Sequence, residues 1–212
     1  TPLCLPRPRG VAHAVRGLLA GLAARVRTTE MRVLVPAGRD PAPDLPALDG
    51  ILQVGRGGES SRALRARIPA SLEQPAAARD VSPWTALPNW AGPRVAWVHE
   101  LPYVRLGPIE GRLRTLRQRR HVARLVAHAA RVVVPSQATR DDLLQVQPGL
   151  AGRTCVIPNA FDPAPWRPRE RVPPRHPYVI AVGVGHSRAA ARKKGLDVLL
   201  KAWRRLPLPG HQ

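Results

Sequence analysis

Apolar residues recur along the chain in two patterns, and the two patterns alternate. After Gly10, apolar side chains three and four residues apart form one stripe over residues 11–26, which predicts an amphipathic helix. Short runs of consecutive apolar residues follow, and such runs are typical of strands covered on both faces of a parallel sheet. This alternation predicts an α/β fold, namely a Rossmann-like parallel sheet with helices on both faces. The predicted strands are residues 32–35, 51–54, 95–98, 132–134, 155–157 and 178–182.

The middle of the chain predicts further helices. A helical pattern rich in arginine runs over about residues 109–130, and a shorter helix is expected around residues 141–144, with two aspartates near its start. Residues 101–103 predict a fixed turn rather than a helix, because a proline restricts the residue before it. Residues 56–93 carry no clear pattern. The apolar face expected for the longer helix consists of Ile109, Leu113, Leu116, Ala123, Val126 and Ala130.

A proline-rich segment divides the chain. Six prolines between residues 163 and 177 indicate a stiff linker or a crossover. Residues 1–162 predict a nearly complete first domain, and residues 178–212 predict only one strand, a glycine-rich loop and one helix of a second Rossmann-like domain. About 35 residues cannot bury an independent core. We therefore expect an incomplete second domain, in a fragment, a truncated gene product or a decayed copy of a larger protein.

The net charge of +20, from 34 Lys+Arg against 14 Asp+Glu, has two explanations. One is an anionic partner, such as nucleic acid, an anionic membrane or a phosphorylated substrate. The other is a bias toward arginine, alanine, proline and glycine, which a GC-rich coding sequence produces without functional pressure. The arginines are spread along the chain and only 4% of the residues are aromatic, which disfavours a dedicated nucleic-acid-binding module.

The cysteines and the apolar runs indicate the cellular compartment in which the protein is expected. Cys4 and Cys155 lie far apart, which excludes a disulfide-rich scaffold and a cysteine-based zinc site and suits a reducing compartment. No apolar run reaches the length of a membrane span, and the first residues lack the long apolar stretch of a signal peptide. We expect a cytoplasmic protein, with the inner face of the membrane as a second place of action.

Polar residues closely follow three of the predicted strands. Ligands of open parallel sheets bind beyond the carboxyl ends of the strands, so these positions are candidates for a site. His99 and Glu100 follow the third predicted strand, where a histidine transfers a proton, hydrogen-bonds a sugar hydroxyl or simply caps a loop carbonyl. Ser136 follows the next strand and caps a helix or contacts a ligand, with capping favoured. Asn159 follows the fifth, where a turn is the default and a cleft-facing role is the alternative.

A glycine-rich loop and a basic helix start follow the last predicted strand. Backbone N–H groups near Gly183 and Gly185, together with Arg188, Arg192 and Lys194, could hold a diphosphate. The segment matches neither the dinucleotide-binding fingerprint nor the Walker A pattern. A solvated basic helix start is the alternative interpretation.

Five segments in chain order carry a family resemblance. They resemble the glycosyltransferases of family 4, which have the GT-B architecture, over about residues 10–206. The segments are Val98-His99-Glu100-Leu101-Pro102, then Ala130-Arg131-Val132-Val133-Val134-Pro135-Ser136 with Arg140-Asp141-Asp142-Leu143, then Val156-Ile157-Pro158-Asn159-Ala160-Phe161-Asp162, then Tyr178-Val179-Ile180-Ala181-Val182-Gly183, and last Arg192-Lys193-Lys194-Gly195-Leu196.

The resemblance implies an acceptor-side Rossmann-like domain at residues 1–162 and the start of a nucleotide-sugar-binding domain at residues 178–212. It implies retaining transfer of a hexosyl group, of the mannosyl or glucosyl class, to a glycan or a lipid-linked acceptor, without a metal or other cofactor. By position, His99 would be the catalytic residue that contacts the transferred sugar, and Lys194 would neutralise the donor diphosphate. Gly10 would lie beside the acceptor or the donor phosphates.

The chain also departs from the family pattern. Glu100 stands where aspartate is commoner, Ala160 replaces a glycine, and Val184 stands where many members have an arginine for the donor phosphates. The family's later Glu-(seven residues)-Glu motif is absent, so efficient transfer by this chain alone is not expected.

Other function classes stay open beside the transferase. One is a non-catalytic relic or interaction module of the same fold. Another is a basic nucleic-acid-binding protein, which the charge suggests and the dispersed arginines oppose, so nucleic acid is not an expected partner. The basic helix at residues 109–130 could also rest on an anionic membrane, where each Lys or Arg contributes about 1 kcal/mol, or it is an ordinary solvated helix face.

Overall fold

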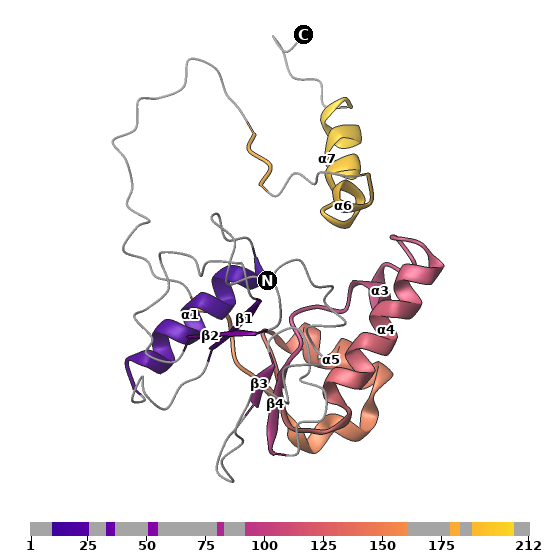
Figure 1. Ribbon diagram of the computed structural model, residues 1–212. Coiled ribbons are helices and arrows are strands. Elements are labelled where there is room, and N and C mark those ends of the chain that lie inside the picture. Colours follow the sequence, from indigo (N-terminus) through magenta and orange to yellow (C-terminus); the bar gives the residue numbers. More distant parts are fainter. Residues whose placement is uncertain are drawn as a thin grey trace, which may run out of the picture. The chain divides into compact units, whose positions relative to one another are not determined.

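A computed structural model describes residues 10–25, 33–36, 51–54, 80–82, 92–160, 179–182 and 188–205. The chain divides into two compact units. The first comprises residues 1–100 and 121–167, and the second comprises residues 101–120 and 168–212. The predicted boundary at the proline-rich linker, residues 163–177, lies outside the described residues and stays a prediction. Figure 1 shows the elements in chain order.

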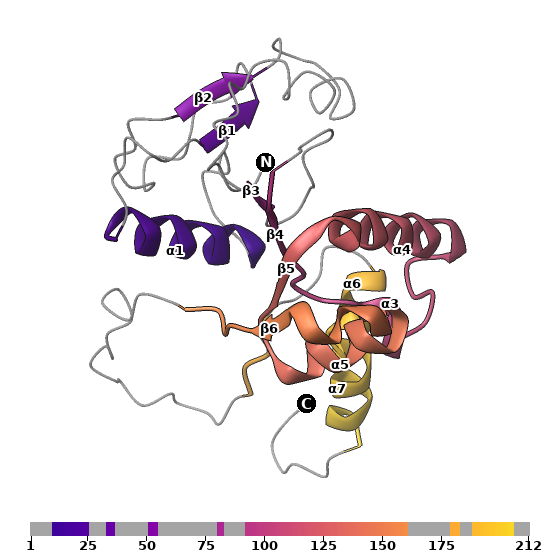
Figure 2. The ribbon, with the colours of Figure 1, turned by 90° about the horizontal axis from the view of Figure 1, so that it is seen from below.

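The first unit is built on a parallel sheet. Four strands pair in the order β3 (Asp80–Ser82), β4 (Arg94–Trp97), β5 (Ala129–Val134) and β6 (Thr154–Val156), and every pair is parallel (Figure 2). A separate parallel pair joins β1 (Val33–Pro36) to β2 (Ile51–Val54). Strands that alternate with helices and pair in parallel confirm the α/β class. β3 lies inside residues 56–93, a region without a clear hydrophobic pattern.

The core of this sheet centres on β5. Val132 and Val134 are fully buried, as is Ala96 on the neighbouring strand β4. Helix α5 (Gln137–Val146) lies against β5 and β6 and inserts the fully buried Leu143. Full burial of one such aliphatic side chain stabilises the fold by about 1.5–3 kcal/mol, so these residues hold β4, β5 and α5 together.

The short helix η4 (Pro148–Arg153) connects α5 to β6. Its Arg153 guanidinium donates a hydrogen bond to the backbone carbonyl of Ala129 at 2.9 Å, and its Leu150 is buried. The Thr154 hydroxyl donates to the Leu150 carbonyl at 2.9 Å. The Arg153 bond ties the entry of β6 to the beginning of β5, and the Thr154 bond ties β6 to η4.

Helix α1 (Val11–Ala23) confirms the first predicted helix. It begins after Gly10, whose φ of 42° lies in the left-handed region that favours glycine. Its buried side chains include Ala12 and Val15. A Cβ atom at Gly17 would lie 3.7 Å from the backbone oxygen of Ala160, so α1 approaches the segment that follows β6.

The predicted helix over residues 109–130 is wrong at both ends. Helix α4 spans Arg112–Ala127, and Ala129 already belongs to β5. Gly111 has a φ of 94°, a conformation that a right-handed helix cannot include, so the helix begins after it. At the other end, Ala129 pairs with β4 in the sheet, so the alanines there continue a strand.

The predicted apolar face of this helix is also wrong in its first half. Leu113 is 74% exposed and Leu116 is 44% exposed, whereas Thr115 is buried. Leu125 and Val126 are buried in the second half. The buried stripe therefore passes through a threonine, which a hydrophobic pattern does not mark, and two leucines are left at the surface.

Two smaller expectations around the sheet need correction. Residues Pro102–Arg105 form the one-turn helix α3 instead of a turn, because proline fits the first helical position, where no N–H is needed. Helix α5 starts at Gln137, earlier than expected, so Asp141 and Asp142 lie beyond its first turn and do not act on its dipole there.

The predicted strand at residues 178–182 is also wrong, as far as residues 179–182 are described. Val179, Ile180 and Val182 are 61%, 69% and 91% exposed, and residues 179–182 pair with no described strand. Without a neighbour to satisfy its backbone, an apolar run does not become a strand. Beyond it, α6 (Arg188–Lys193) and α7 (Leu196–Trp203) are separated at Gly195, whose φ is 69°.

Candidate functional site

Three candidate residues follow three neighbouring strands at the same edge of the sheet. His99 comes shortly after β4, Ser136 after β5 and Asn159 after β6. The sheet hydrogen bonds continue past these strands, since the Val98 N–H donates to the Val133 carbonyl at 2.9 Å and the Ile157 N–H donates to the Val134 carbonyl at 2.9 Å. Because β4, β5 and β6 are adjacent and parallel, their carboxyl ends share one edge, which is where ligands of open α/β sheets bind.

His99 is held against Trp97. The ring centroids lie 4.6 Å apart with an interplanar angle of 32°, and the histidine is half-buried. Trp97 is only 8% exposed, so it forms a rigid wall beside the imidazole. The two residues are two positions apart, and side chains i and i+2 of an extended chain point to the same face. A wall of this kind fixes the imidazole before a ligand arrives.

Sequence reasoning missed Trp97. Its indole N–H is buried, and no hydrogen-bond acceptor lies near it among the residues that the structure describes. A buried donor without an acceptor is costly, by about 1–3 kcal/mol. The signal available in the sequence was the i, i+2 spacing to His99 at the end of a strand.

Ser136 caps helix α5. Its Oγ accepts a hydrogen bond from the backbone N–H of Thr139 at 3.2 Å and lies 3.0 Å from the Thr139 hydroxyl. Its backbone is extended, with a φ of −154°, as an N-cap residue requires. The favoured capping role is thus confirmed. The side chain is exposed, so it also borders the edge where His99 lies.

Replacing Ser136 by alanine is expected to lower the free energy of unfolding by about 1 kcal/mol, because the Thr139 N–H loses its acceptor. Ser136→Asp keeps an acceptor at the same place and is the matched control. Chemical denaturation followed by circular dichroism measures both. Equal stability of the alanine and aspartate variants would contradict the capping role.

For the remaining acceptor-side candidates, the structure gives the position along the backbone and the exposure of the side chain. Glu100 and Asn159 are exposed. Gly10 directly precedes α1 and forms the turn into the helix. The expected turn at residues 158–162 is described only as far as Ala160.

The described donor-side candidates lie in α6 or directly before Gly195, the residue that precedes α7. Gly183 and Gly185 lie outside the described residues, and Arg188 begins α6. Arg192 is exposed in the last turn of α6. Lys194 is exposed directly before Gly195, the residue that precedes α7, so it stands at the amino end of that helix.

Within the described segments, no group of three or more His, Cys, Asp or Glu side chains could hold a metal ion. In the same segments, no helix combines the length and the apolar character needed to cross a membrane.

Cys155 is an exposed free thiol whose Sγ lies 3.6 Å from the Val132 carbonyl.

Comparison with protein-family models, with curated proteins and with solved structures finds no match to this chain.

Proposed function

We propose that the chain belongs to a glycosyltransferase that moves a hexosyl group from a nucleotide-sugar to a glycan or lipid-linked acceptor. The observation that carries the proposal is the shared edge of β4, β5 and β6, which brings the ends of three of the family-like segments together. His99, Glu100, Ser136 and Asn159 are polar residues of these segments at that edge.

The proposal includes a finer view of the fold. Residues 1–162 are the acceptor-side Rossmann-like domain, with helices on both faces of its sheet. Residues 178–212 belong to a second domain of the same type, which contacts the nucleotide-sugar. The described strands lie within residues 1–162, and the helices α6 and α7 lie within residues 178–212.

The proposed reaction joins an acceptor hydroxyl oxygen to the anomeric carbon of the donor sugar with retention. The bond from that carbon to the β-phosphate oxygen breaks, and the nucleoside diphosphate leaves with the electron pair. The proton of the acceptor hydroxyl passes to the departing phosphate oxygen. Negative charge thus develops on the diphosphate, and cationic groups placed there stabilise the transition state.

Two residues have assigned roles in this reaction. His99, fixed against Trp97, hydrogen-bonds the transferred sugar. Lys194, exposed at the amino end of α7, supplies a point charge to the diphosphate. No metal ion has a part in this step.

Donor binding to the full chain tests the proposal. Isothermal titration with UDP-glucose and with GDP-mannose is expected to give saturable binding of at least one donor. Lys194→Gln is expected to weaken it about tenfold, because a charge-assisted contact to phosphate is lost. Lys201→Gln on α7 removes the same charge from an exposed position and is the control.

Two results would argue against the transferase. Binding of neither donor, together with DNA binding that falls steeply with salt, would favour the nucleic-acid-binding class. Equal loss of donor affinity in Lys194→Gln and Lys201→Gln would show a diffuse charge effect instead of a diphosphate contact.

A further inference from the structure

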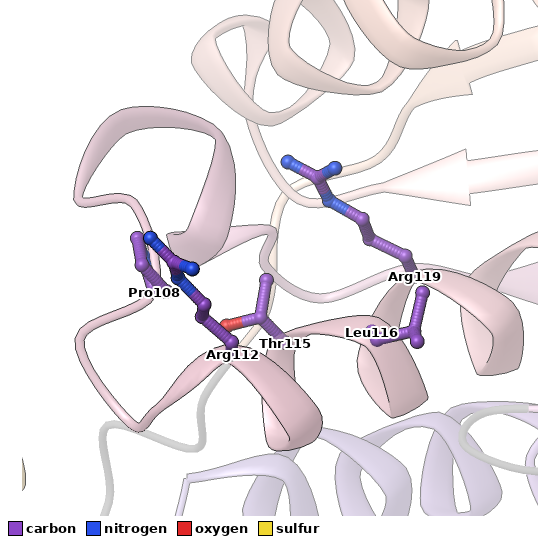
Figure 3. A pocket seen from close by; sticks show the side chains of 5 residues that line it. All are labelled: Pro108, Arg112, Thr115, Leu116 and Arg119. Carbon is purple, nitrogen blue, oxygen red and sulfur yellow. The ribbon is translucent and has the colours of Figure 1, made fainter.

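A pocket of about 290 Å³ lies between the loop after α3 and the first two turns of α4. Its lining residues are Pro108, Arg112, Thr115, Leu116 and Arg119 (Figure 3). Three of these, Arg112, Thr115 and Arg119, are three and four residues apart, so they share one helix face. The volume is at the small end of ligand pockets, which suits a compact group such as a phosphate with its bound water.

The two arginines of the pocket have no acidic counterpart in the part of the chain that the structure describes. Among the described residues, no carboxylate lies within ion-pair distance of Arg112 or Arg119. The nearby Glu110 is engaged elsewhere, since it pairs with Arg114 at 2.8 Å and accepts a hydrogen bond from Gln118 at 2.8 Å. The charge of the pocket is therefore not neutralised from within this part of the chain.

Arg119 is also held in place by an aromatic ring. Its guanidinium carbon lies 5.4 Å from the centroid of Tyr103, a cation–π contact. Burial raises the pKa of the Tyr103 phenol above its ordinary value, and the charge of Arg119 opposes this only in part. Tyr103 is thus neutral at physiological pH and does not cancel the charge of Arg119.

The reach of the side chains suits one shared anion. Arg112 and Arg119 are seven residues apart, which is about 10 Å along the helix axis. Thr115 lies between them, and Figure 3 shows its hydroxyl oxygen on the side of Arg112. A ligand held above Thr115 is within reach of both flexible guanidinium groups, which match phosphate oxygens well.

We propose that this pocket binds the phosphate group of a phosphorylated ligand, with Arg112, Arg119 and the Thr115 hydroxyl as donors. The half-exposed Leu116 adds an apolar wall, and the exposed Leu113 lies on the same turn outside the pocket. Exposed leucines beside a phosphate site are compatible with a membrane surface as well as with solvent. The phosphate thus belongs either to a soluble metabolite or to a lipid headgroup. The proposal uses none of the residues assigned to the donor diphosphate and does not depend on transferase activity.

The test is isothermal titration of inorganic phosphate into the full chain at physiological salt. Arg112→Gln with Arg119→Gln is expected to weaken binding at least tenfold. Arg117→Gln with Arg120→Gln removes the same charge from exposed positions of α4 outside the pocket, and is expected to change the affinity less than twofold. Equal losses in the two double variants, or no phosphate binding by the unsubstituted chain, would overturn the proposal.

A second variant keeps the test independent of folding. Thr115→Val preserves the shape of the buried side chain and removes only the hydroxyl. It is expected to weaken phosphate binding about threefold, with an unchanged circular dichroism spectrum. An unchanged affinity would remove the hydroxyl from the site and overturn the proposed donor set.

Vesicles identify the source of the phosphate. Selective loss of sedimentation with phosphatidylglycerol vesicles in the Arg112/Arg119 variant, but not in the Arg117/Arg120 variant, would support a lipid headgroup. Equal sedimentation of both variants, combined with the selective loss of phosphate affinity, would support a soluble phosphorylated ligand. Vesicles of phosphatidylcholine alone are the uncharged control.

Discussion

Replacing His99 by alanine is expected to lower the turnover number for donor consumption about a hundredfold, the scale of a positioned proton-transfer or hydrogen-bonding group. The imidazole lies 4.6 Å from the Trp97 ring, so its orientation is set before the sugar binds. Loss of a group that acts mainly in the transition state lowers kcat with little effect on KM. Release of nucleoside diphosphate, followed enzymatically, gives both constants.

The exposed His128, which lies between α4 and β5, supplies the matched control. His128→Ala removes the same side chain away from the candidate edge and is expected to leave the turnover number unchanged. If His99→Ala and His128→Ala retain equal activity, His99 is a structural histidine. The transferase would then need a different catalytic residue.

Replacing Leu143 by alanine is expected to lower the free energy of unfolding by about 2–5 kcal/mol. The side chain is fully buried between α5 and the sheet, so its removal leaves a cavity and cancels its transfer free energy. A loss of this size lowers Tm by roughly 10 °C in a chain of this length. Differential scanning calorimetry measures the shift.

The neighbouring Leu144 allows a matched comparison on the same helix. Leu144 is only half-buried, so Leu144→Ala is expected to cost clearly less than Leu143→Ala. Equal losses would mean that α5 does not present Leu143 to β5 and β6. That result would also question the sheet edge at which Ser136 caps the same helix.

The central strands were predictable from the sequence because their apolar runs are strong local signals. The runs at 95–98 and 132–134 became β4 and β5, and the helix before them became α1. The order of the strands in the sheet could not be predicted from any single apolar run, because strand pairing depends on contacts between distant segments. β3 was missed because three residues with one valine give too little pattern.

The candidate site was predictable only in part. Position after a strand located His99 and Ser136 at the candidate edge, and N-cap preference correctly favoured capping by Ser136. The packing of Trp97 against His99 could not be predicted, because the burial of a single tryptophan cannot be inferred from its identity alone. The pocket on α4 was missed because its arginines are seven residues apart on a helix that looked uniformly basic. Thr115, which links them, looked like an ordinary polar position.

The end of the chain shows where an apolar pattern misleads. Residues 178–182 have the composition of a strand, but the described part of this run is exposed and unpaired. A strand needs a neighbour to satisfy its backbone N–H and C=O groups. Propensity alone therefore could not decide the structure of this segment.

Proton NMR of the reaction mixture tests the central claim most directly. The full chain is incubated with an α-linked nucleotide-sugar and candidate saccharide acceptors, and the anomeric signals are followed over time. Because efficient transfer by this chain alone is not expected, our account predicts that the donor signal falls slowly and that a new α-linked signal grows, and that both changes slow about a hundredfold in His99→Ala. A donor signal that persists unchanged in every mixture would contradict the transferase, and a β-linked product would contradict retention.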